Sequence, residues 1–213
     1  MTLCLFAKLP RAGQVKTRLA RALGEARALE LARAFLEDSL LALRSQDRPW
    51  VLALDDPAPP GTFPADVRVV LQGPGDLGER MTRVLGAALR EGPLAVALGA
   101  DTPGLPWQLV RDATALLERA GGPEAVLGPC SDGGYYLLGA RRLPAGALAG
   151  VRWSTEHAYA DTRSRLAEAG LAVDATGAWF DVDEAADLER LRATLAADAT
   201  MVAPATRRAL GLE

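Results

Sequence analysis

The sequence has few of the residues on which histidine and cysteine sites depend. Its 213 residues include one histidine, His157, and two cysteines, Cys4 and Cys130, which stand far apart and form no C-x-x-C pair. These counts exclude a histidine-rich metal centre, a zinc ribbon and a disulfide framework. A metal site must therefore use mostly oxygen ligands, which suits Mg²⁺ or Mn²⁺. A Ser-His-Asp site would depend on His157 alone, and the pattern around that residue predicts an exposed helix.

Long apolar runs and an excess of positive charge are also missing. No stretch approaches the roughly 20 apolar residues that a membrane span needs, and the apolar run at residues 3–7 is too short for a signal peptide. With 24 Lys plus Arg against 27 Asp plus Glu, the net charge is -3, which argues against a nucleic-acid partner. We expect a cytoplasmic protein that acts on small molecules.

Short apolar runs alternate with longer segments of helical periodicity. This alternation predicts an α/β fold with a mostly parallel sheet covered on both faces. An expected hairpin around residues 125–140 makes the sheet mixed. No repeat or linker divides the chain, so we expect one domain over residues 1–213, with the structure of the tail at 198–213 left open. A helix is expected at residues 16–43, with a break near Gly24, and a strand at residues 178–183.

Ligands of such sheets bind at the carboxyl ends of the strands, so the segments that follow each strand matter most. Lysine is scarce, and both lysines lie in the first of these segments, within LCLFAKLPRAGQVKTRL. Its cations and glycine suit a cradle for phosphate at a helix N-terminus; a solvated basic loop is the alternative. The Walker A spacing is absent. The residues concerned are Lys8, Pro10, Arg11, Gly13, Lys16 and Arg18.

A glycine motif follows the third predicted strand. Gly73, Gly75 and Gly78 match G-x-G-x-x-G, with Asp101 at the distance expected in a dinucleotide site. Pro74 removes an amide from the turn that would bind pyrophosphate, and the motif normally follows the first strand. A plain glycine turn at the rim of another site is the competing interpretation.

Aspartates follow three other strands. Asp101 is expected at the end of a buried strand, where a metal or cation would compensate its charge, or as a helix cap. Asp181 and Asp183 stand two apart, where alternation predicts that both face one side and chelate an ion; an N-cap is the alternative. Asp132 is expected in a hairpin turn, and the double glycine after it permits close approach of a ligand.

The segments AKLPRAGQVKTRL, QGPGDLGERM, GADTPGLP, GPCSDGGYYLLGA, WST and FDVDEAADL cover residues 3 to about 191. In this order they resemble a family of small bacterial GT-A-fold proteins that are described as glycosyltransferases. The family is related to 2-phospholactate guanylyltransferase and the molybdenum cofactor nucleotidyltransferases. The resemblance implies a nucleotide-diphospho-sugar transferase-like three-layer sandwich. The chain departs from the late D-x-D-[TS]-P-E-D-L signature of these proteins at residues 184–186.

The resemblance also implies site residues of four kinds. Nucleotide contacts are expected from Lys8, Pro10, Gly13, Lys16, Arg18 and Arg80. Divalent metal ligands are expected from Asp101, Asp181 and Asp183. The acceptor side is expected to comprise Asp132, Gly133, Gly134, Tyr135, Trp153, Ser154 and Thr155. Lys16, Arg18 and Asp101 are the expected catalytic residues.

Metal-dependent transfer from a nucleotide-activated donor to a small-molecule acceptor is the leading hypothesis. Glycosyl transfer from a nucleotide-sugar is favoured over nucleotidyl transfer, which would release pyrophosphate. A nicotinamide-dependent oxidoreductase and a non-catalytic nucleotide-binding module are the weaker alternatives. The sequence leaves the oligomeric state open.

Overall fold

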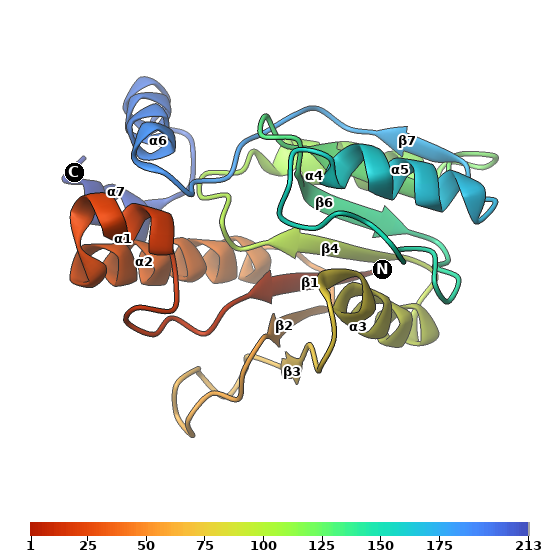
Figure 1. The fold of residues 1–213 in the computed structure, drawn as a ribbon, viewed down its shortest axis with the longest axis horizontal. Coiled ribbons are helices and arrows are strands. Elements are labelled where there is room, and N and C mark those ends of the chain that lie inside the picture. The colour runs from red at the N-terminus through yellow and green to blue at the C-terminus, as the bar shows by residue number, and fades with distance from the viewer. Residues whose placement is uncertain (213) are drawn as a thin grey trace.

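The computed structural model describes residues 1–212 and is built around a seven-stranded sheet (Figure 1). The strands lie in the order β3-β2-β1-β4-β6-β5-β7. Strand β6 runs antiparallel to both of its neighbours, β4 and β5, and the other pairs are parallel. The mixed, mostly parallel sheet and its hairpin are therefore confirmed. The strand bounds are Thr2–Ala7 (β1), Trp50–Leu54 (β2), Val69–Leu71 (β3), Ala95–Gly99 (β4), Ala125–Pro129 (β5), Tyr135–Ala140 (β6) and Val173–Ala175 (β7).

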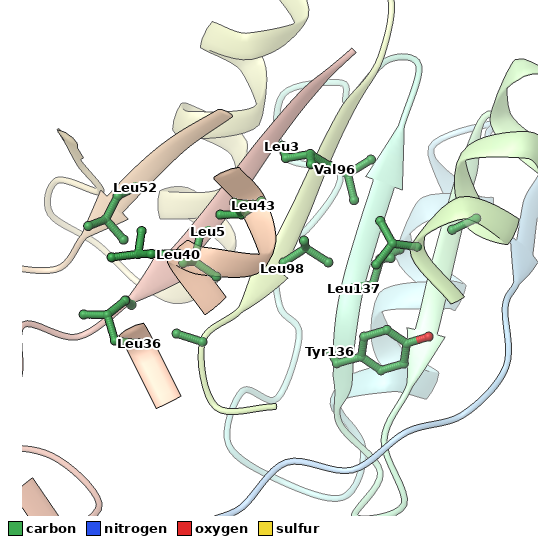
Figure 2. Packing of buried hydrophobic residues seen from close by; sticks show 14 of the residues in the cluster. Leu3, Leu5, Leu36, Leu40, Leu43, Leu52, Val96, Leu98, Tyr136 and Leu137 are labelled. Carbon is green, nitrogen blue, oxygen red and sulfur yellow. The ribbon is translucent and has the colours of Figure 1, made fainter. Parts of the chain in front are cut away.

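Helices cover both faces of the sheet, as the apolar strands require. Side chains along β1 alternate between the two faces, with Leu3 and Leu5 in one buried cluster and Cys4 in another. The first face packs against α2 (Glu25–Arg44) and α4 (Trp107–Glu118), and the second against α3 (Leu77–Glu91) and α5 (Ala158–Glu168). Figure 2 shows the contribution of α2 to the first face, from Leu36, Leu40 and Leu43.

A third apolar cluster lies beyond the ends of β1 and β4, where four helices gather (Figure 1). It joins α1 (Thr17–Leu23), α2, α6 (Ala185–Ala197) and α7 (Pro204–Leu210) around the buried ring of Phe35. The expected break near Gly24 is confirmed, since this residue ends α1 and precedes α2 with φ of 85°. Within the tail that the sequence left open, residues 198–213, the helix α7 occupies Pro204–Leu210. Glu213 lies outside the described residues.

The carboxylate of Asp38 anchors α7 to α2. Its two oxygens accept hydrogen bonds from the backbone N–H groups of Ala205 and Thr206, both at 2.8 Å. These are amides of the first helical turn, which no carbonyl within the helix can satisfy. Burial nevertheless raises the pKa of Asp38, although its hydrogen bonds act in the opposite direction.

The strand expected at residues 178–183 is absent. After β7 the chain makes one isolated bridge, between Trp179 and Cys130, and then leaves the sheet. Within residues 1–212 no helix is long and apolar enough to cross a membrane.

Candidate functional site

The predicted site residues follow strands that end at one edge of the sheet. Strands β1, β4 and β5 point the same way, because β6 runs antiparallel to both β4 and β5. The loop at residues 8–16 follows β1, Asp101 follows β4, and Asp132 lies in the turn between β5 and β6. The segment at residues 176–183 returns to the same edge, where Trp179 pairs beside the end of β5.

Lys16 lies at the centre of this edge. Its Nζ atom is 2.5 Å from Oδ1 of Asp101 and 3.0 Å from Oδ1 of Asp183. The Lys16 side chain is only 4% exposed, and its ammonium lies 5.7 Å from the centre of the Phe35 ring. The sequence motifs therefore converge, as expected, on a single cluster of one cation and two carboxylates.

The chain reaches this position through an unusual backbone conformation. Lys16 has φ of 48° and ψ of 45°, the left-handed region, and directly precedes the first residue of α1. Left-handed geometry is uncommon for a residue with a Cβ atom. It turns the chain from the loop into α1 and brings the long side chain beneath Asp101 and Asp183.

Backbone hydrogen bonds bring Asp183 to Asp101. The N–H of Val182 donates to the carbonyl oxygen of Asp101 at 3.0 Å. One turn into α6, Arg190 stacks on Phe180, with its Cζ atom 4.0 Å from the ring centre, and donates to Ser131 Oγ at 3.1 Å. Arg190 thus fastens the segment before α6 to the β5–β6 turn. Sequence reasoning missed this residue, because neither contact follows from spacing along the chain.

The charges explain why a lysine can be buried here. Burial acts to lower the pKa of Lys16, but the attraction of Asp101 and Asp183 outweighs it, so the pKa is raised and the ammonium stays charged. Asp101 follows the buried strand β4, as expected, but its side chain is 61% exposed. Asp101 therefore needs no metal to be stable, and the buried group that needs compensation is Lys16.

Asp181 belongs to a second cluster, together with Cys130 and Asp132. One ligand atom each from Cys130, Asp132 and Asp181 lies within 4.8 Å of the others. Burial raises the pKa of Asp181 to about 6, with repulsion from Asp132 and Asp183 adding to the effect. Sequence reasoning assigned no role to Cys130; its place two residues before Asp132 in PCSDGG was the available signal. Burial also raises the pKa of this thiol, which makes it a poor metal ligand at neutral pH.

The loop after β1 is held by residues 55 and 56, which follow β2, and its other side is exposed to solvent. The N–H of Leu9 donates to Asp55 Oδ1 at 2.8 Å, and Arg11 pairs with Asp56 at 2.5 Å. Lys8 and Gly13 are exposed at the surface of this loop, and Pro10 is partly exposed. Arg18, in the first turn of α1, lies 3.5 Å from Glu184 and is exposed. Of the predicted phosphate ligands, Lys16 is the one that contacts the aspartate pair directly among the described residues.

The segment that leads into α3 lies at the same edge of the sheet. Its buried Gln72 donates a side-chain hydrogen bond to the carbonyl oxygen of Ala7, the last residue of β1, at 3.2 Å. Arg80 lies in the first turn of α3 and donates to the carbonyl oxygen of Gly75 at 2.9 Å. Asp76 and Glu79 form a reciprocal capping box, which occupies two of the amides that a pyrophosphate would need and adds two negative charges. This arrangement favours a glycine turn over the dinucleotide site.

The predicted acceptor side adjoins the second cluster. A Cβ atom on Gly133 would lie 2.1 Å from the carbonyl oxygen of Glu156, so this turn and the 153–156 segment are in tight contact. Ser154 and Thr155 are exposed. The Tyr135 ring, in contrast, packs edge-on against the Trp153 ring, with 6.4 Å between the ring centres, and its hydroxyl lies beside Thr162. Asp132 is exposed, and its Oδ1 accepts from Gly134 N at 2.8 Å. Tyr135 and Trp153 are therefore placed inward against the second apolar cluster, away from the surface where Asp132, Ser154 and Thr155 are exposed.

A cavity of about 360 Å³ lies on the other side of the loop that follows β4. It is bounded by α2, the start of α4 and residues 198–202, and neither Lys16 nor the two aspartates line it. The candidate site is an open edge, where the side chains of Asp101 and Asp183 are 61% and 42% exposed, and not a closed chamber.

Comparison with known proteins agrees with this arrangement. Residues 28–155 match the family described as "Uncharacterized protein conserved in bacteria (DUF2064)". No curated protein shows significant sequence similarity to the chain. A protein of Desulfovibrio desulfuricans G20, provisionally assigned as a nucleotide-diphospho-sugar transferase, is 29% identical with a TM-score of 0.88, over 99% of this chain and 93% of that one.

Two further solved structures share the fold at lower identity. CMP:2-keto-3-deoxy-manno-octonic acid synthetase in complex with CTP is 14% identical with a TM-score of 0.59, over 92% of this chain and 98% of that one. The 2-C-methyl-D-erythritol 4-phosphate cytidylyltransferase of Thermus thermophilus is 18% identical with a TM-score of 0.50, over 91% and 97%. The nucleotide-diphospho-sugar transferase fold is therefore confirmed.

Proposed function

Because the chain belongs to the DUF2064 family and has a nucleotide-diphospho-sugar transferase fold, we propose that it is a metal-dependent transferase that uses a nucleotide-activated donor. One observation carries the proposal: Lys16 meets Asp101 and Asp183 at the carboxyl edge of the sheet. A cation for phosphate and carboxylates for a divalent ion are the components that such a transfer requires.

The donor set fits a divalent metal. Asp101 and Asp183 offer hard carboxylate oxygens, as Mg²⁺ and Mn²⁺ prefer, and both are open to solvent. The two distances to Lys16 Nζ add to 5.5 Å, so the Oδ1 atoms lie no farther apart than that. A bound metal would supply charge neutralisation for the phosphates and for the leaving group. Asp181 remains a third predicted ligand, from the neighbouring cluster.

We assign the cationic groups to the phosphates. Lys16 binds one phosphate with its compact ammonium charge. Lys8, from the loop after β1, and Arg18, from α1, neutralise the remaining phosphate charge. Arg80 contributes from the N-terminus of α3. The proposal contains no protein nucleophile, so catalysis consists of positioning the acceptor and stabilising negative charge.

Glycosyl transfer is the reaction we favour. The oxygen of an acceptor hydroxyl forms a bond to the anomeric carbon and loses its proton to solvent, the bond from that carbon to the phosphate oxygen breaks, and a nucleoside diphosphate leaves. The exposed acceptor side, with Asp132, the two glycines after it, and Ser154 and Thr155, supports this choice by offering hydroxyl and carboxylate groups for a polar acceptor.

Nucleotidyl transfer is the second candidate. The same fold is used by a CTP-bound synthetase and by a cytidylyltransferase. An acceptor phosphate oxygen would then bond to the α-phosphorus, and pyrophosphate would leave.

The test is a thermal-shift panel of nucleoside triphosphates, nucleotide-sugars and NAD, with and without Mn²⁺, followed by product analysis. Release of a nucleoside diphosphate supports glycosyl transfer, and release of pyrophosphate supports nucleotidyl transfer. Asp101→Asn is expected to abolish the Mn²⁺-dependent stabilisation by nucleotide. Asp174→Asn, on exposed β7, is the matched control and is expected to retain it. Equal stabilisation of both variants would refute the assignment of Asp101.

A further inference from the structure

The Lys16 ammonium occupies the space in which Asp101 and Asp183 would have to bind a metal. Its Nζ atom contacts the Oδ1 atoms of both residues at 2.5 and 3.0 Å. The two carboxylates face solvent, with exposed fractions of 61% and 42%, whereas the Lys16 side chain is buried beneath them. A cation arriving from solvent therefore meets carboxylates that already share a positive charge.

We propose that Lys16 and the divalent metal compete for Asp101 and Asp183, so that the metal binds weakly until a phosphate draws the ammonium away. The inference rests on the proposed function for the identity of the two ligands. Like charges repel strongly in a partly buried site, and a lysine shared by two carboxylates compensates them in the free protein. A phosphate offers Lys16 an equivalent partner, which frees both carboxylates for the metal.

Competition predicts positive coupling between phosphate and metal. A ligand that favours the state with a free carboxylate pair must raise the affinity for the metal, and the metal must raise the affinity for that ligand by the same factor. The protein would then take up metal together with its nucleotide instead of holding a resident ion. Lys16 acts here as a positioning residue for the carboxylates as well as a phosphate ligand.

The competing arrangement leaves Lys16 in place. Each carboxylate also has a second oxygen, Oδ2, in addition to the Oδ1 atom that Lys16 contacts. A metal held only by those outer oxygens would bind with an affinity that does not depend on the Lys16 charge. The two arrangements are therefore distinguished by the affinity of the metal in the absence of nucleotide.

The first experiment is calorimetric titration of the full chain with Mn²⁺ alone. Lys16→Met keeps the apolar stem and removes the charge, and it is expected to bind Mn²⁺ at least ten-fold more tightly than the unaltered protein. Lys16→Met combined with Asp101→Asn is expected to lose that gain, which places the ion at the proposed ligands. Equal affinity in the unaltered protein and in Lys16→Met would overturn the competition.

The failure of this inference can be told from the failure of the proposed function. If Lys16→Met gains nothing while Asp101→Asn still abolishes metal-dependent stabilisation by nucleotide, the competition is wrong and the transferase site stands. If neither change matters, the metal site itself is refuted along with the competition.

A second experiment uses the unaltered protein and so avoids any folding defect of Lys16→Met. The chain has two lysines, and Lys8 is exposed whereas the Lys16 side chain is buried. Acylation of each amine can be followed by peptide mass spectrometry, with Lys8 as the internal reference. Saturating Mn²⁺ is expected to raise the labelling rate of Lys16 several-fold relative to Lys8. An unchanged ratio in protein that is saturated with Mn²⁺ would contradict displacement.

Discussion

The backbone N–H of Tyr159 donates a hydrogen bond to the carbonyl oxygen of Gly133 at 2.9 Å. This contact ties the first turn of α5 to the turn that carries Asp132. Gly133 has φ of 88°, and its Cα lies so close to the 156 carbonyl that no side chain fits between them. The position of the acidic turn is thus set by a glycine and by the helix that follows the predicted acceptor segment.

Substitution of Gly133 is expected to be costly for this reason. Gly133→Ala adds a Cβ atom that would lie 2.1 Å from the Glu156 carbonyl oxygen, on a backbone that already disfavours side chains. We expect a loss of about 2–4 kcal/mol in the free energy of unfolding, since both strain and displacement contribute. Gly121→Ala is the matched control, because Gly121 has φ of 70° with open space around its Cα. It should lose about 1 kcal/mol. Urea titration of both variants checks this, and similar losses would show that the Glu156 contact is unimportant.

Asp181 gives the metal-free protein a specific pH dependence. Its pKa is raised to about 6, from an ordinary value of 3.8, mainly by burial and then by Asp132 and Asp183. The folded protein therefore binds this proton more tightly than the unfolded chain, and stability must fall as the pH rises from about 4 to about 6.

Asp181→Asn removes the ionised carboxylate and should abolish this decrease. At pH 7.5 in EDTA we expect the variant to be more stable by about 1–2 kcal/mol, allowing for partial solvent screening, and to match the unaltered protein near pH 4. Chemical unfolding at the two pH values is the measurement. A variant that is less stable at pH 7.5 would show that the Asp181 carboxylate is stabilised in the folded protein.

Much of the fold was predictable, because its determinants are local. The break at Gly24 and the end of α3 at Gly92 follow from glycines at helix ends. The extended segment at 178–183 was not predictable as such, because its pattern is that of a strand while its backbone partners are one isolated bridge at Trp179 and the carbonyl of Asp101, far away in sequence.

The sequence predicts which residues lie at the candidate site better than it predicts which of them contact one another. Loops that follow parallel strands meet at one edge, so Lys16, Asp101 and Asp183 could be expected to converge. Whether the lysine would lie between the carboxylates depends on the left-handed turn at residue 16 and on side-chain packing against Phe35. The grouping of Asp181 with Cys130 and Asp132 likewise depends on where the chain leaves the sheet, which no spacing rule gives.

Arg18 provides a test of the cationic approach to the site. It is exposed, and its one ion pair, to Glu184 at 3.5 Å, is weak. Arg18→Ala is therefore expected to leave the unfolding free energy within about 0.5 kcal/mol of the unaltered value. We expect its affinity for a stabilising nucleotide to fall about ten-fold, through loss of a charge-assisted hydrogen bond.

Arg21→Ala, at the other end of α1, removes the same charge from an exposed position and should leave that affinity unchanged. Nucleotide titration by calorimetry compares the two variants. Equal losses would mean that the loop attracts nucleotide only through its overall charge.

At residue 16, backbone preference and chemistry call for different amino acids. Glycine or asparagine relieves a left-handed turn, whereas only lysine provides the compact ammonium that reaches both aspartates. Selection for thermal robustness alone would drift away from lysine at this point, while selection for transfer would retain it. Under the proposed role of Lys16, we therefore expect the residue at this one position in related chains to distinguish a working enzyme from a scaffold that has kept the architecture and lost the reaction.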